Sequence, residues 1–318
     1  MKHLGISSLA VLLLLAAGCA WLDRSETEDY VILQAALGDV QVVSTKGAPT
    51  TSLGNTFNVW AYVYPASGSI GTPNYTCGEV FTKQGATTTY ESALIHGRIP
   101  TGYTVKYWAL TPETVTALGG LSALPNATTS GVPSFSYTVP SSVASQTDLL
   151  VACTDWAGGS STAPALAFQH VLSGVQFYAT TSLPSCTVTR VELSEIHTKG
   201  TYTEGSSWSN LDTKSTLGIV KNVTFTNGTE KPVYVGDDTM MLIPGSLTSG
   251  SKLSVRYKVG DSAEKTAVAD ISAVTLPQGT LTKIILGISN DTITLTVVTA
   301  GQEIELKLDP STIDIVWS

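Results

Sequence analysis

The sequence predicts an all-β protein with two consecutive β-sandwich domains. Short runs in which apolar and polar residues alternate with period 2 follow one another along most of the chain, and helical periodicity is almost absent. Clusters of Gly, Pro and Ser separate these runs at intervals that are typical of antiparallel sandwiches. The length of 318 residues is close to twice the ~150 residues of an average domain.

The composition narrows the class of protein. Hydrophobic residues make up 42% of the chain, which is enough for packed cores and excludes a disordered or collagen-like protein. Charged residues make up only 13%, against about 25% in an average protein, and Ser and Thr take their place. A formal net charge of −8 argues against a nucleic-acid partner, which would call for a basic protein. These features indicate an extracellular, β-rich protein.

The first 18 residues have the features of a lipoprotein signal peptide. A basic start at Lys2 precedes an apolar run over 9–17, which is too short to span a membrane. Small residues then lead directly to Cys19, as in a bacterial lipobox, where the thiol receives acyl chains such as palmitate. An ordinary cleavable signal with an incidental cysteine is the alternative. We therefore expect a signal peptide over 1–18 and lipid attachment at Cys19.

Residues 19–29 are polar and mostly acidic, so we expect a solvated tether that leads to the first domain, residues 30–163. No later segment has the ~18 continuous apolar residues of a membrane helix. Pro112 and the glycines that follow it predict one short helix over 111–118. A turn-rich segment at 155–164 places the domain boundary after residue 163. Aromatic and β-branched residues predict strands at 30–36, 57–64 and 103–110.

The second domain is expected over residues 164–318. Its strands are predicted at 166–178, 188–196, 240–243, 252–259, 282–288 and 292–298. Apolar and polar residues keep alternating at the end of the chain, first over 303–309 and again after Pro310. In the second stretch one apolar face is formed by Ile313, Ile315 and Trp317. This stretch either closes its own domain as an edge strand or leaves the domain to join a neighbouring molecule.

The sequence carries no motif for catalysis or for metal or cofactor binding. It has no His-Glu-x-x-His pair, nucleophile elbow, phosphate-binding loop or dinucleotide fingerprint. The histidines lie at no ligand spacing, and His170, within an expected strand, is interpreted as structural. With Cys19 acylated, at most one disulfide could form among Cys77, Cys153 and Cys186. We predict that the protein is not an enzyme and needs no metal or cofactor.

Several motifs in a fixed order resemble the fimbrillins, the type V pilins that certain Gram-negative anaerobes carry as outer-membrane lipoproteins. The most specific matches are the strand Asp148-Leu-Leu-Val-Ala and a Phe-x-His-x-Leu-Ser-x-Val strand at 168–175, which opens the family's second domain. The other matching segments are 31–36, 44–48, 57–62, 106–112, 199–202 with Trp208, and 241–245 followed by a Leu-x-Val-x-Tyr strand. The resemblance implies two transthyretin-like β-sandwich domains.

The resemblance also implies how the subunits assemble. In this family a protease removes the first strand after export, and a C-terminal strand of a neighbouring subunit fills the groove by donor-strand exchange. The position that matches the family's processing Arg is Lys46, so cleavage is expected between Lys46 and Gly47. The donor strand is expected to present Ile313, Ile315 and Trp317. Because Lys replaces Arg, either the protease accepts Lys46 or the subunit stays uncut as an anchor or accessory subunit.

The predicted function is therefore that of a structural subunit of a surface fimbria that contributes to adhesion. The expected partners are neighbouring subunits in a homopolymer or mixed fimbria, a maturation protease, and the outer membrane through the lipid anchor. A host or bacterial surface ligand of unknown identity is also expected, and no nucleic acid. The alternative is a monomeric surface lipoprotein that binds glycans or peptides through exposed aromatic side chains, of which six Trp and twelve Tyr are candidates.

Overall fold

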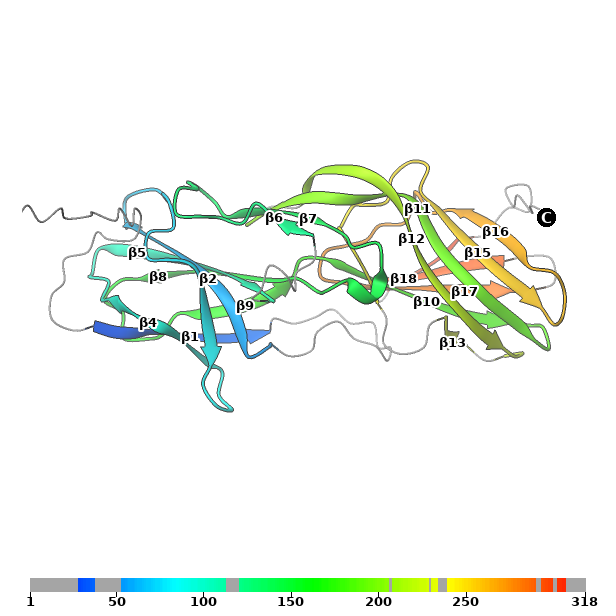
Figure 1. Cartoon of the computed structure of the whole chain (residues 1–318), viewed down its shortest axis with the longest axis horizontal. Helices are drawn as coiled ribbons and strands as arrows, with labels where there is room; N and C mark the ends of the chain where they lie inside the picture. The colour runs from blue at the N-terminus through cyan, green and yellow to red at the C-terminus, as the bar shows by residue number, and fades with distance from the viewer. Residues whose placement is uncertain are drawn as a thin grey trace, which may run out of the picture.

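The computed structural model describes residues 28–37, 53–112, 120–205, 208–228, 230–233, 239–289, 293–299 and 302–306. Within these ranges it contains nineteen strands and a single 3₁₀ turn at Val143–Ser145, so the predicted all-β class is confirmed. The molecule is elongated, with a barrel at one end and two facing sheets at the other (Figure 1). Most of the helix expected over 111–118 lies outside the described ranges. Among the residues described, no helix is both long and apolar enough to cross a membrane.

Seven strands of the N-terminal half close into a barrel by hydrogen bonding. In their order around the barrel they are β1 (Glu28–Leu37), β4 (Thr89–Gly97), β3 (Thr76–Lys83), β2 (Thr56–Pro65), β5 (Tyr103–Thr111), β8 (Leu150–Ala157) and β9 (Ala165–His170). Alternate residues are buried inside, for example Val59 on β2 and Val105 and Tyr107 on β5. This half therefore fits a β-sandwich-like arrangement in which hydrogen bonding also joins the sheet edges.

The C-terminal half forms two sheets that face each other across an apolar core. The first sheet runs β13 (Lys231–Pro232), β10 (Ser173–Thr181), β17 (Leu281–Ile288), β18 (Ile293–Thr299) and β19 (Gln302–Leu306), with β14 (Met240–Leu242) also on β10. The second runs β16 (Lys265–Asp270), β15 (Lys252–Val259), β11 (Cys186–Thr203), β7 (Ser134–Thr138) and β6 (Leu121–Ser122), with β12 (Ser209–Phe225) on the other edge of β11. Both sheets contribute buried residues to the core, among them Phe177 and Val191.

The chain passes between the two halves more than once. β6 and β7 precede β8 in the sequence, yet residues 134–138 of β7 pair with 199–203 of β11 in the second half. β9 lies beyond the boundary expected after residue 163, yet it completes the barrel with β1 and β8. The boundary itself stays a prediction. The prediction of one strand over 166–178 is wrong, because β9 ends at His170 and β10 begins in another sheet at Ser173.

Aromatic side chains fill the space where the two halves meet. Trp60 and Trp108 of the barrel lie with ring centres 4.8 Å apart, and Phe135 of β7 lies 6.3 Å from Trp108. Trp208 lies 5.9 Å from Phe135 and 5.5 Å from Tyr202 of β11. All five belong to one core cluster, called the aromatic bridge below. Its three tryptophans are buried, so they are not exposed rings that could bind a glycan or peptide.

Candidate functional site

The first strand closes the barrel between two strands that are distant from it in the sequence. β1 runs antiparallel to β4, with Leu33 opposite Tyr90, and parallel to β9, with Gln34 opposite Ala165. Its sequence neighbour β2 lies elsewhere in the barrel, between β3 and β5 (Figure 1). Because no hairpin joins β1 to a pairing partner, the strand can be withdrawn without unravelling a neighbour. β1 is called the closing strand below.

The two ends of the closing strand are held differently. Residues 28–34 pair with β4, whereas only residues 34–37 pair with β9. At the point where both ladders meet, the Gln34 N–H donates to the carbonyl oxygen of Pro164 at 2.9 Å. Among the described strands, the start of the closing strand therefore has one paired neighbour and its end has two. The strand is anchored more firmly at the end that leads towards β2.

The side chains of the closing strand alternate between core and surface. Leu33 is fully buried, whereas Ile32 is 45% exposed. Leu33 belongs to the same core cluster as Phe57, whose ring centre lies 4.6 Å from that of Tyr90 and 5.0 Å from that of Phe168. Burial of one leucine contributes roughly 1.5–3 kcal/mol. Removal of the closing strand would leave an apolar groove between β4 and β9, which carry Tyr90 and Phe168.

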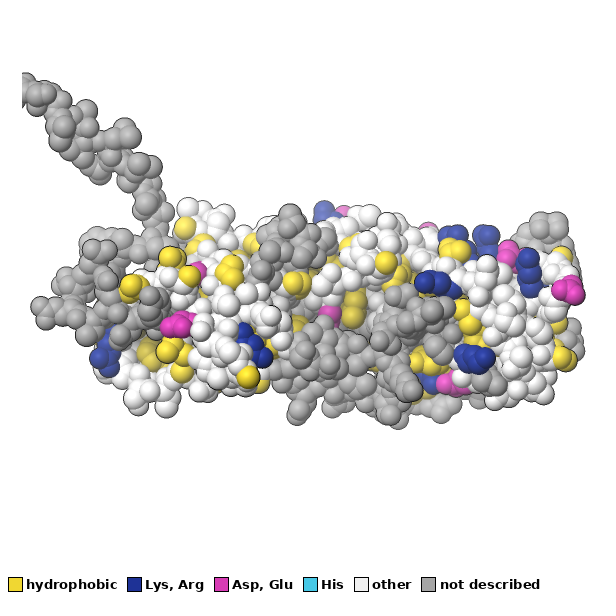
Figure 2. All heavy atoms as spheres, turned by 60° about the horizontal axis from the view of Figure 1, so that its bottom comes forward, with side chains coloured by type: hydrophobic (Ala, Val, Ile, Leu, Met, Phe, Trp, Pro, Cys, Tyr) yellow, Lys and Arg dark blue, Asp and Glu magenta, His cyan; other side chains and the backbone are white. Residues whose placement is uncertain are grey.

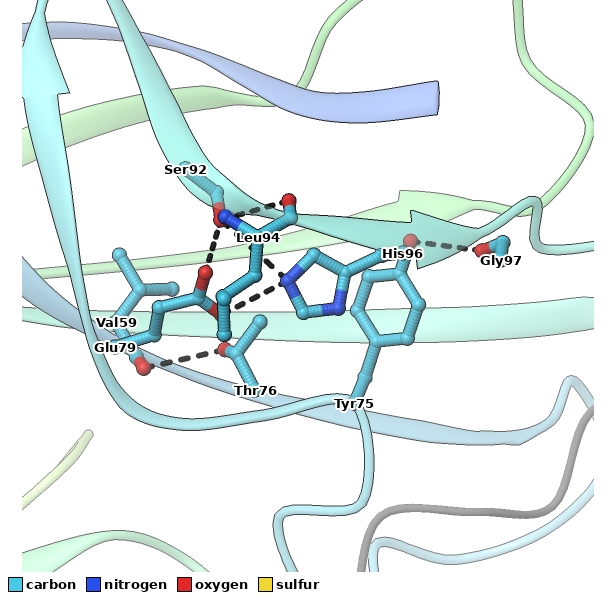
Figure 3. A network of polar contacts seen from close by, with 8 residues as sticks. All are labelled: Val59, Tyr75, Thr76, Glu79, Ser92, Leu94, His96 and Gly97. Carbon is cyan, nitrogen blue, oxygen red and sulfur yellow. Dashed lines mark hydrogen bonds and ion pairs between the residues drawn. The ribbon is translucent and has the colours of Figure 1, made fainter. Parts of the chain in front are cut away.

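A polar network fixes the irregular part of β4 beside the closing strand (Figure 3). The pairing of β4 with β1 slips at residues 92–94 of β4, which form a bulge. The Ser92 hydroxyl donates to Glu79 Oε1 and accepts from the Leu94 N–H at 2.9 Å. Glu79 Oε2 lies 2.8 Å from His96 Nε2. The network therefore ties the bulge to the neighbouring strand β3.

This Ser, His and Glu set does not have the geometry of a catalytic triad. In a triad the acid and the serine bind opposite nitrogens of the imidazole. Here Glu79 and Ser92 both approach His96 Nε2, at 2.8 and 3.5 Å. Ser92 is also buried, with 3% of its surface exposed. Burial, with a contribution from Glu79, raises the pKa of Tyr75 to about 12, so this neighbour of His96 stays protonated and donates to the Gly97 carbonyl at 2.9 Å.

A buried ion pair holds the other strand of the groove in place. Asp148 precedes β8 and His170 ends β9, and Asp148 Oδ2 lies 2.6 Å from His170 Nδ1. Both side chains are almost fully buried, and Leu150 of β8 pairs with His170. The pair thus joins β9 to β8, which agrees with the structural role predicted for His170. The two residues come from the two segments whose resemblance to the fimbrillins was the most specific, which is the sequence signal that they share.

The sites singled out from the sequence for lipidation, cleavage and strand donation lie outside the described ranges: Cys19, Lys46, Gly47, Ile313, Ile315 and Trp317. Their roles stay predictions. The described chain ends in β19, where Leu306 pairs with Leu295 of β18, so the start of the terminal alternating segment belongs to its own sheet. Among the described residues, no group of His, Cys, Asp and Glu is arranged to hold a metal ion.

Three cysteines of the described chain are thiols and form no disulfide: Cys77, Cys153 and Cys186. Burial raises the pKa of Cys153 to about 12. Glu204 adds to the increase, whereas the Lys106 ammonium, 3.6 Å from the sulfur, acts in the opposite direction. Burial alone raises the pKa of Cys186 to about 11. Because the thiolate is the nucleophile, these two groups are unreactive at neutral pH.

We expect iodoacetamide at pH 8 to leave Cys153 and Cys186 of the native protein unmodified. With a pKa of about 12, only about one Cys153 in 10⁴ is a thiolate at pH 8. The same residues should react fully in urea, where the pKa returns to its ordinary value. Peptide mapping by mass spectrometry measures both states. Rapid modification of native Cys153 at pH 8 would contradict the buried environment described here.

Comparison with known proteins identifies the family. A model of the fimbrillin-like family matches residues 46–308. The chain belongs to the fimbrillin-like family. Members of this family are structural pilus subunits, so the fimbrillin-like chain is a component of a cell-surface fimbria that associates with other fimbrial subunits. It is not an enzyme, as the sequence predicted.

Solved structures agree with this fold. A Bacteroides ovatus protein with a proposed role in cell adhesion is 14% identical, with a TM-score of 0.53 over 89% of this fimbrillin-like chain and 100% of its own. A fimbrial assembly protein from Parabacteroides distasonis is 8% identical, with a TM-score of 0.44 over 88% and 100% of the two chains. The fimbrial anchor protein Mfa2 from Porphyromonas gingivalis is 13% identical, with a TM-score of 0.38 over 87% and 98%. No curated protein matches the sequence.

Proposed function

We propose that this chain is exported as an outer-membrane lipoprotein, acylated at Cys19, and polymerises by protease-triggered donor-strand exchange at the closing strand. The proposal includes two transthyretin-like domains. The single observation that carries it is the position of β1, which closes the barrel between β4 and β9 without a hairpin to either. A strand in that position can be replaced by another strand that offers the same alternation of side chains.

The end of the chain offers such a strand. Ile313, Ile315 and Trp317 are spaced by two residues, as are Leu33 and Ala35, the buried residues of the closing strand. The larger side chains of the terminal segment would bury more apolar surface than the closing strand does. Main-chain hydrogen bonds to β4 and β9 would contribute about 1 kcal/mol each. The exchange is therefore favourable on both counts.

Cleavage is expected between Lys46 and Gly47 in assembled subunits. The site lies between β1 and β2, so one cut there releases the closing strand, whereas a cut before residue 28 would not. N-terminal sequencing of polymer recovered from cells should give Gly47. Lys46→Gln should abolish polymer formation, and Lys83→Gln at the end of β3 serves as the matched control. A mature N-terminus at Cys19 in polymerised material would contradict this cleavage.

Deletion of residues 311–318 is expected to leave a folded monomer that cannot polymerise. Ile315→Asp should have nearly the same effect, because the groove would have to bury an unpaired carboxylate. Val316→Asp is the matched control, since Val316 lies on the opposite face of the same segment. The readout is the ladder of polymers on SDS gels without boiling. A truncated variant that melts normally yet still gives ladders would refute the assignment of the donor strand.

An uncut anchor or accessory subunit is the second candidate function. The observation that favours it is the residue at the cleavage position, where Lys46 stands in place of the family's Arg. An uncut subunit keeps its closing strand and its lipid, so it could donate a strand but not accept one. It would then terminate a fimbria at the membrane. Recovery of a lipid-bearing N-terminus at Cys19 together with co-purifying fimbrial subunits would support this role over that of a shaft subunit.

A further inference from the structure

The outer face of the second sheet carries a row of cations. In β15 the inward residues Leu253, Val255 and Tyr257 are buried in the core. The outward residues are half-buried Ser254 and three exposed cations, Lys252, Arg256 and Lys258. Figure 1 shows β11, β12, β15 and β16 side by side at the C-terminal end of the molecule, and in Figure 2 Lys and Arg side chains gather at the same end.

A fourth cation lies across the strand pair. Arg190 of β11 is directly opposite Arg256, and directly opposed like charges destabilise an antiparallel pair. The Arg190 guanidinium donates to Glu192 Oε1 at 2.6 Å, which compensates its charge. Arg256 and Lys258 form no ion pair with a described residue. The cationic row, as defined here, consists of Arg190, Lys252, Arg256 and Lys258.

The acidic residues beside the cationic row already have partners. Glu192 binds Arg190, and Glu264 accepts a hydrogen bond from the Thr189 hydroxyl at 2.5 Å. Asp270 lies opposite Lys252 and accepts a hydrogen bond from the Ser272 hydroxyl at 2.5 Å. The two charges that remain uncompensated are thus adjacent outward positions of one strand. An anion that binds here would relieve the repulsion between Arg256 and Arg190.

The shape and polarity of this face favour an extended ligand. At about 3.3 Å per residue, Arg256 lies roughly 7 Å from Lys258 and roughly 13 Å from Lys252 along the strand. Hydroxyl groups flank the row on the neighbouring strands, from Thr187, Thr189, Thr224 and Thr266. A polymer that lies along β15 would therefore meet several charges in line, with hydroxyl partners on both sides.

We propose that the cationic row binds a linear acidic polysaccharide that carries sulfate or carboxylate groups. Arg binds such groups with two parallel hydrogen bonds, and the threonine hydroxyls can donate to and accept from sugar hydroxyls. The chain as a whole has a net charge of −8, so a polyanion is attracted locally at this row and not by the protein as a whole. The row does not include the closing strand, so this binding is independent of strand exchange.

The test uses the full chain in detergent and immobilised heparin as the sulfated probe, with neutral dextran as the reference. The double variant Arg256→Gln/Lys258→Gln should lower the affinity for heparin by about tenfold or more, because each charge-assisted contact contributes severalfold. The matched control is Lys83→Gln/Arg98→Gln, which removes the same charge from the barrel. Circular dichroism melting of both variants should match that of the parent chain, since all four side chains are on the surface.

An equal loss of affinity in both double variants would reduce the effect to net charge and overturn the proposal. Unchanged heparin binding in the Arg256→Gln/Lys258→Gln variant would also overturn it, as would equal retention on dextran. Vesicles that contain anionic phosphatidylglycerol are the last arm. Vesicle binding through the cationic row without heparin binding would assign a lipid surface in place of a polysaccharide and would refute the proposal.

Discussion

Leu33→Asp is expected to destabilise the barrel by about 4 kcal/mol or more. Replacement of a fully buried leucine by a small residue costs about 2–5 kcal/mol, and an unpaired carboxylate in the same place adds a desolvation penalty. The substituted closing strand would no longer compete for its position between β4 and β9. Urea unfolding followed by tryptophan fluorescence measures the loss, because Trp60 and Trp108 lie on barrel strands.

The control for this prediction is the neighbouring residue. Ile32 lies on the same strand but is 45% exposed, so Ile32→Asp should change the free energy of unfolding by less than about 0.5 kcal/mol. The two variants have the same charge and the same position in the chain to within one residue. Equal destabilisation by both would show that the register of the closing strand differs from the one described. In cells, Leu33→Asp should also make the strand easier to displace.

Trp208→Ala is expected to lower the stability of the whole molecule by about 3–5 kcal/mol. Trp208 packs against Phe135 and Tyr202 in the aromatic bridge, and its indole N–H donates to the Val171 carbonyl oxygen at 2.6 Å. Truncation leaves a cavity in the core and an unpaired carbonyl. Because the bridge couples the two halves, we also expect one cooperative unfolding transition to separate into two in calorimetry.

Two variants separate the causes of this effect. Trp208→Phe keeps an aromatic ring but removes the N–H donor, so it should recover most of the packing but not the hydrogen bond to Val171. Trp156→Ala removes an indole of the same size from a half-buried position in the barrel, where its N–H donates to Thr162. Its effect should be less than half that of Trp208→Ala. A single sharp transition in Trp208→Ala would argue against the bridge as the coupling element.

Strands with a clear apolar alternation could be located from the sequence almost to the residue. The range 103–110 became β5 at Tyr103–Thr111, and 252–259 became β15 at Lys252–Val259. The first half of β12 could not be found in this way, because residues 209–216 are exposed on both faces and carry no period. The break between β9 and β10 was missed for the opposite reason. Val171 and Leu172 at the break are both buried, so no polar residue, Gly or Pro marks the change of sheet.

The candidate site was predictable only in part. The first strand and its place before the expected cleavage position followed from the sequence and the family resemblance. Its pairing with β9 did not, because parallel pairing between segments more than a hundred residues apart leaves no local signal. The network of Glu79, Ser92 and His96 has no motif spacing, and the bulge that it holds arises only when β1 and β4 pair. Terminal segments outside the described ranges keep their predicted roles untested.

The passage of β6 and β7 into the second half has a mechanical consequence. In Figure 1 the strands of both halves run broadly along the length of the molecule, and β7 lies along β11 there. A pull between the two ends of the subunit therefore loads the β7–β11 ladder in shear, where its hydrogen bonds share the force and must break together. A flexible linker would extend first. This fimbrial subunit is instead built to carry tension as a stiff rod, which suits a filament that holds a cell against flow.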